Sequence, residues 1–167
     1  LPQAGGIEEE TLFSTAVHEV TILPRQGMEL SVVPDPLTTV PWGPADPGAE
    51  PGDVNNGQAQ VSGAAYIATI TNTSSADHTF LMEVVPAGFP AEWIMLGGAG
   101  RAYTTTVSLS AGQPGRLGIY IAPVDIGLLP PVGTEYPFTV HVTAMDAPSL
   151  SESAAETFVM PRVSFMR

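Results

Sequence analysis

The sequence predicts an all-β fold, an antiparallel sandwich of about seven to nine strands, and three observations lead to it. The 167 residues include 17 Gly and 17 Pro, whereas charged residues make up only 13% of the chain, a composition that disfavours long helices. Apolar side chains recur at every second position in several short segments, as they do in strands that bury one face. Turn residues separate these segments at intervals of about 10–20 residues, so two sheets packed face to face would bury the apolar sides.

The N-terminal part contains candidate strands and a proline-rich connection. Residues 11–23 are rich in β-forming side chains and end before Pro24, although a short amphipathic helix is the alternative. Residues 28–33 alternate more clearly, with three apolar side chains on one face. Residues 34–58 hold six Pro and four Gly, which excludes a long regular element and predicts an extended linker or a long loop draped over the sandwich.

The clearest strands follow this connection. We expect them at residues 60–71, 78–85, 102–110, 116–122, 136–144 and 156–160. Polar or Gly- and Pro-rich turns separate them, and residues 87–100 are irregular. The chain therefore divides into residues 1–58, with N-terminal strands and the connection, and residues 59–167, with the sandwich, unless the first part packs onto the second as one domain.

Residues 66–144 show a particular order of strands and turns. A strand ends in an Asn-rich turn at 70–73, and the next strand runs into the segment VPAGFPAEW at 85–93. A Thr-rich strand then leads to a Gly-Gln-Pro-Gly turn at 112–115, and the following strand ends in Ile-Tyr-Ile-Ala-Pro at 119–123. This order resembles the immunoglobulin-like and fibronectin-type-III-like accessory domains of bacterial secreted and cell-surface proteins.

The resemblance implies an immunoglobulin-like sandwich that lies outside the cytoplasm, either secreted or on the cell surface. It implies a non-catalytic role, as a spacer, adhesion or accessory domain of a larger protein, and it transfers no catalytic residue to this chain. The antibody-type subgroup has a pair of Cys residues that joins its two sheets. This chain has no Cys and does not match that subgroup.

Charge restricts the possible partners. The net charge is -12, with 17 Asp and Glu residues against five Arg and no Lys. This charge repels phosphate backbones and anionic lipid surfaces, so we expect no nucleic-acid partner. No segment approaches the roughly 20 apolar residues of a membrane-spanning helix, so we expect no membrane insertion. The chain starts with Leu and shows no signal peptide, as in a mature protein or an excised part of a longer one.

The sequence offers no catalytic motif. His18, His78 and His141 do not have metal-ligand spacing, and there is no Gly-x-Ser-x-Gly elbow. Glu83 and Glu92 are the best candidates for a carboxylate pair, but solvated acids on loops are the simpler interpretation. Without Cys, the chain lacks disulfides, thiolate nucleophiles and Cys-ligated zinc. We therefore predict no catalytic residue, no enzymatic activity and no organic cofactor.

Calcium is the one metal for which the sequence gives some support. Asp53 and Asn55 place oxygen ligands at alternate positions, and Gly57 follows them, as at the start of an EF-hand-like loop. A third acid and the distal bidentate Glu of such loops are missing. Asx and Gly residues also form ordinary turns, which is the alternative interpretation.

Aromatic residues in irregular segments are the remaining candidates for a binding site. Trp42, Phe89 and Trp93, with Tyr103 nearby, could stack on sugar rings or anchor a protein partner. Packing of these rings on the end of the sandwich is the favoured alternative, because exposed Trp is uncommon. The leading functional hypothesis is thus a non-catalytic module with an unknown protein or glycan partner, and the second is a carbohydrate-binding module that uses the loop aromatics.

Overall fold

The computed structural model describes residues 23–48 and 57–163, and these residues form an all-β protein as predicted. The only helical elements of the described residues are two three-residue 3-10 turns, η1 (Ala91–Trp93) and η2 (Ile126–Leu128). The strands are β1 (Met28–Pro34), β2 (Thr39–Trp42), β3 (Ala59–Ser62), β4 (Ala65–Asn72), β5 (His78–Pro86), β6 (Ile94–Leu96), β7 (Thr104–Leu109), β8 (Pro114–Ile121), β9 (Glu135–Ala144) and β10 (Ser151–Val159).

The described residues therefore form ten strands, where the sequence predicted about seven to nine. The extra strands are short and lie in segments that we expected to be irregular or continuous. β2 forms inside the proline-rich connection, and β6 forms inside residues 87–100. The predicted strand at 60–71 is split into β3 and β4 because Gly63 adopts a positive φ of 84° and turns the chain between them.

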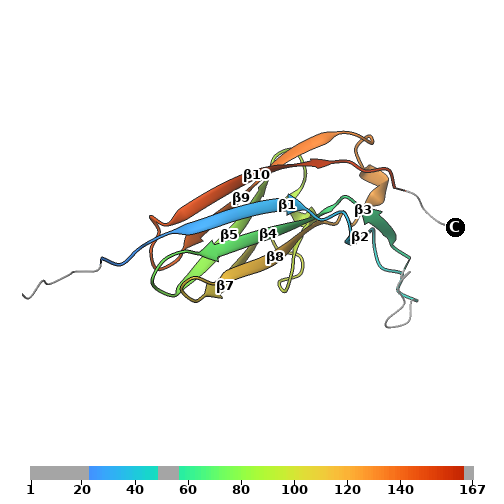
Figure 1. The fold of residues 1–167 in the computed structure, drawn as a ribbon. Coiled ribbons are helices and arrows are strands. Elements are labelled where there is room, and N and C mark those ends of the chain that lie inside the picture. The colour runs from blue at the N-terminus through green and yellow to red at the C-terminus, as the bar shows by residue number, and fades with distance from the viewer. Residues whose placement is uncertain (1–22, 49–56, 164–167) are drawn as a thin grey trace, which may run out of the picture.

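Two four-stranded antiparallel sheets form the sandwich (Figure 1). The first has the order β1-β4-β8-β6 and the second the order β10-β9-β5-β7. If β7 is left aside and the other seven sheet strands are lettered A to G along the chain, the first sheet has the A-B-E-D order of immunoglobulin domains and the second has G-F-C. β7, which lies between strands D and E in the chain, is an added edge strand next to strand C. The fold is therefore an immunoglobulin-like sandwich.

The core lies between the two sheets and is built from the alternate side chains of each strand. Phe80, Phe138 and Phe158 of the second sheet are almost completely buried, as are Ile70 and Ile119 of the first. Each such side chain contributes about 1.5–3 kcal/mol by leaving water. The sheets are also joined across the core by a hydrogen bond that the hydroxyl of Tyr66 donates to the carbonyl of Thr157, at 3.1 Å.

A small two-stranded ribbon of β2 and β3 closes one end of the sandwich. Its inward side chains Val40, Trp42 and Val61 are buried. The Nε1 of Trp42 donates a hydrogen bond of 2.7 Å to the carbonyl of Ile121, the last residue of β8. Part of the proline-rich connection is thus ordered and covers this end of the core. β1 and β2 precede residue 58 in the chain, and both pair with strands that follow residue 58.

The described chain enters and leaves the sandwich at opposite ends. The segment that leads into β1 lies at one end, and the segment that follows β10 lies at the other, where the β2–β3 ribbon also lies (Figure 1). We call these ends the entry pole and the exit pole. The strand predicted at residues 11–23 falls, apart from Leu23, outside the described residues. Within the described part of the chain, neither helical turn approaches the length needed to cross a membrane.

Candidate functional site

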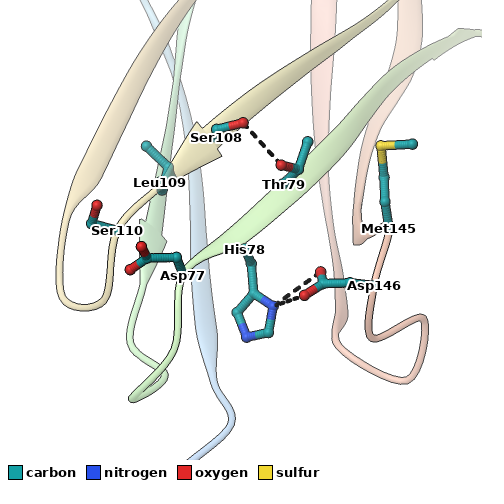
Figure 2. Close-up of a pocket in the computed structure, with 8 residues that line it drawn as sticks. All are labelled: Asp77, His78, Thr79, Ser108, Leu109, Ser110, Met145 and Asp146. Carbon is teal, nitrogen blue, oxygen red and sulfur yellow. Dashed lines mark hydrogen bonds and ion pairs between the residues drawn. The ribbon is translucent and has the colours of Figure 1, made fainter.

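A hollow of about 320 Å³ opens at the entry pole, where three loops meet (Figure 2). The turn before β5 contributes Asp77, the end of β7 contributes Ser108, and the β9–β10 turn contributes Asp146. His78, the first residue of β5, lies at its base and is only 7% exposed. The hollow therefore combines carboxylates, hydroxyls and one buried imidazole.

His78 and Asp146 form the central contact of this hollow. The Nδ1 of His78 lies 3.0 and 2.9 Å from the two carboxylate oxygens of Asp146, so the Nδ1–H tautomer, assigned from this contact, donates to the carboxylate. The hydrogen bond from His78 is the main reason why the pKa of the Asp146 carboxyl lies below its usual value. Because Asp146 is largely exposed and His78 is buried, the pair ties the exposed β9–β10 turn to β5.

The second ring nitrogen of His78, Nε2, is buried and has no hydrogen-bond partner among the described residues. The nearby hydroxyls of Thr79 and Ser108 bond to each other at 2.9 Å instead (Figure 2). The contact of His78 with Asp146 is therefore a structural link between the start of β5 and the β9–β10 turn. The imidazole ring of His78 also packs edge-on against Phe80, at a centroid distance of 5.9 Å.

A second hollow, of about 490 Å³, lies at the sheet edge where the chain passes from η1 and β6 to the start of β7. We call it the edge hollow. Glu92, Arg101 and Tyr103 line it together with the apolar side chains of Ala91, Ile94 and Ala102 and with Thr104. The Nη1 of Arg101 donates to the carbonyls of Glu92 at 3.0 Å and Ala122 at 2.8 Å. These two bonds fix the guanidinium between two loops, beside a Tyr103 side chain that is half exposed.

The structure packs Trp42, Phe89 and Trp93 in or against the core and leaves Tyr103 half exposed. Trp42 is fully buried under the β2–β3 ribbon, and Phe89 is 6% exposed. Phe89 stacks on Trp93 at a centroid distance of 6.1 Å and meets Phe158 edge-on at 5.9 Å, so these rings cap the core. Trp93 is only partly buried. Trp42 and Phe89 consequently have no open ring face on which a sugar could stack, whereas Tyr103 does line a hollow.

The calcium candidates Asp53 and Asn55 lie outside the described residues. Within residues 23–48 and 57–163, no group of three or more His, Asp or Glu side chains is placed to hold a metal ion. His18 also lies outside, and His141 is an exposed residue of β9 whose Nδ1 is 2.6 Å from the Ser153 hydroxyl. Glu83 is on β5, opposite His141 in the register with β9, whereas Glu92 belongs to η1. The two carboxylates therefore come from different elements.

Comparisons with known proteins add little to this description. No protein-family model matches the sequence, and no curated protein matches it. Among solved structures, the chain is similar to a FixG-related protein from Vibrio parahaemolyticus, with 10% sequence identity and a TM-score of 0.47. The match covers 81% of this chain and 97% of that one. At this level the likeness carries no argument about function.

Proposed function

We propose that this chain is a non-catalytic, extracytoplasmic immunoglobulin-like module that acts as a spacer or accessory domain of a larger protein. The observation that supports it best is that the segment leading into β1 and the segment following β10 lie at opposite poles of the sandwich (Figure 1). Segments attached before and after such a module are held apart by its long axis. A module of this geometry adds length to a protein without bringing its neighbours into contact.

The strand pairing supports the same role. β1 pairs with β4 over seven residues, and β10 pairs with β9 over nine. Antiparallel hydrogen bonds run perpendicular to the strands. A pull at the two poles acts along β1 and β10, so it loads these bonds together rather than one after another. This geometry resists extension, which is a useful property in a spacer.

An acidic, Lys-free surface is compatible with this proposal. With a net charge of -12, copies of the module repel one another and stay soluble. The extracytoplasmic location rests on the resemblance to accessory domains of bacterial surface proteins. Carbohydrate binding through Trp42, Phe89 and Trp93 is less well supported, because the first two side chains are buried.

Two measurements test the proposal. We expect a tandem of three copies, measured by small-angle X-ray scattering, to gain a constant increment of maximum dimension with each added copy. A compact particle would argue against a spacer. Fractionation of the producing cells, followed by an antibody against this domain, should place it outside the cytoplasmic membrane. Recovery in the cytoplasmic fraction alone would contradict the location.

A further inference from the structure

We propose that the edge hollow binds a neutral sugar residue, with Tyr103 as the stacking surface and with Arg101 and Glu92 as the hydrogen-bonding groups. Of the aromatic residues that the sequence suggested, this site keeps only Tyr103, because Trp42, Phe89 and Trp93 do not line the hollow. It also does not depend on the spacer role, since a module can be a spacer with or without a glycan site.

The shape and lining of the edge hollow fit a small polar ligand with apolar faces. Its volume of about 490 Å³ lies in the range of roughly 300–1,000 Å³ that is usual for ligand sites. Ala91, Ile94 and Ala102 provide an apolar lining, and a few polar groups converge on it. Apolar walls with a small number of placed polar groups are the common pattern of such sites.

Arg101 is held in place before any ligand arrives. Its Nη1 is bonded to the carbonyls of Glu92 and Ala122, on the two loops that flank the hollow. Within the described chain, no carboxylate lies within salt-bridge distance of this guanidinium, although the protein is strongly acidic. Because the side chain is already ordered, a ligand that bonds to its other N–H groups causes little further loss of rotamer freedom.

The charges of the lining select the class of ligand. A carboxylate accepts hydrogen bonds and a guanidinium donates them. Each hydroxyl of a sugar can do both, so Glu92 and Arg101 together match the neighbouring hydroxyls of a neutral ring. An anionic ligand would meet the like charge of Glu92, and a cationic ligand would meet that of Arg101. A neutral pyranose therefore fits this pair better than a charged ligand.

Tyr103 supplies the apolar contact that a sugar ring needs. Its side chain is 50% exposed, although its backbone is fixed because its carbonyl accepts a 2.8 Å hydrogen bond from the N–H of Val84. The C–H face of a pyranose is apolar, and an aromatic side chain combines a large apolar face with a polar tip. A rigid backbone with an open ring is what a stacking surface requires.

The test is binding of the whole chain to polysaccharides, measured by affinity electrophoresis and then by calorimetry with soluble oligosaccharides. The neutral probes are xyloglucan, galactomannan and mixed-linkage β-glucan, and the charged probes are polygalacturonate and chitosan. We expect at least one neutral probe to bind. Tyr103→Ala should weaken this binding about tenfold or more, and Tyr103→Phe should retain it to within about threefold.

Leu37→Ala is the matched control, because Leu37 is 92% exposed and does not line the hollow. It should bind as the wild type does. The circular-dichroism spectrum and melting temperature of Tyr103→Ala establish that the variant is folded. The proposal is overturned if no neutral probe binds, if Tyr103→Ala binds as tightly as the wild type, or if a charged probe binds more tightly than every neutral one. None of these outcomes bears on the scattering test of the spacer role.

Discussion

The imidazole of His78 and the carboxylate of Asp146 are 68 residues apart in the chain and 2.9 Å apart in the fold. The contact joins the start of β5 to the β9–β10 turn at the entry pole (Figure 2). The imidazole is buried, and the carboxylate is more than half exposed. The buried imidazole thus holds the exposed β9–β10 turn in place. The contribution of this contact to the free energy of unfolding can be measured by replacing Asp146.

Asp146→Asn should destabilise the protein at neutral pH and have less effect in acid. The folded pKa of Asp146 is lower than its unfolded value, mainly because His78 donates a hydrogen bond to it. A depressed carboxyl pKa contributes stability above the unfolded pKa, near 4, and this contribution is lost as the pH falls through the folded pKa. Urea unfolding at pH 7 and pH 3 measures it. Glu152→Gln, an exposed change on β10, is the control, and an equal deficit at both pH values would contradict the prediction.

Replacement of Trp42 should show that the ribbon is part of the core. Trp42→Ala removes a fully buried indole and should cost about 3–5 kcal/mol of unfolding free energy. Trp42→Phe keeps most of the packing but leaves the carbonyl of Ile121 without its 2.7 Å partner, at a cost of about 1–3 kcal/mol. The Leu37→Ala control should change the unfolding free energy by less than about 0.5 kcal/mol. A Trp42→Ala protein as stable as the wild type would show that the ribbon is not needed.

Tyr66 should remain protonated well above the usual pH for tyrosine. Burial, with a smaller effect from the negative charge of Glu156, raises its pKa to about 12. Because the folded pKa exceeds the unfolded value near 10, the stability linked to this group is complete below pH 10 and falls as the pH rises toward 12. Absorbance at 295 nm during an alkaline titration should show a late-titrating phenol. Tyr66→Phe should remove it, and an unchanged titration curve would exclude the assignment.

Replacement of Asn72 by either Ala or Asp should destabilise the protein. Its side chain is fully buried, and its Nδ2 donates to the carbonyls of Ala76 at 2.8 Å and Leu109 at 3.0 Å. Asn72→Ala leaves these acceptors unpaired and should cost about 1–3 kcal/mol. Asn72→Asp should cost more, because a carboxylate would replace the donor that faces two carbonyl oxygens. Thermal unfolding measures both, and an Asp variant more stable than the Ala variant at pH 7 would be inconsistent with this network.

The alternation of apolar side chains was enough to find the main strands. The predicted strand at 78–85 corresponds to β5 and that at 136–144 to β9, because both strands bury every second side chain in the core. β10 begins at Ser151, earlier than the predicted start at 156. The residues Ser-Glu-Ser-Ala-Ala have weak β propensity, and it is the pairing with β9 that makes them a strand.

The candidate sites were much less predictable, because they depend on contacts between distant residues. Nothing near His78 in the sequence indicates Asp146. One of the two carbonyls that order Arg101 belongs to Ala122, which is 21 residues away in the sequence. The sequence favoured packing of Trp42 over a role as a ligand platform, and its hydrogen bond to the last residue of β8 shows where the indole is anchored. The sequence offers Tyr103 and Glu92 as separate candidates, but no local pattern places them together or beside Arg101.

The opposite poles have a consequence for how this fold can be recombined. Circular permutation and insertion into a host loop succeed most easily when the ends of a domain are close together. Here the two ends lie at opposite poles of the sandwich (Figure 1), and β10 alone, with nine residues, is about 30 Å long. A circular permutant would need a peptide of roughly that length to join the original ends. In a host protein, the two residues that flank the insertion would have to lie about as far apart. The fold is suited to connection in series and poorly suited to nesting inside another domain.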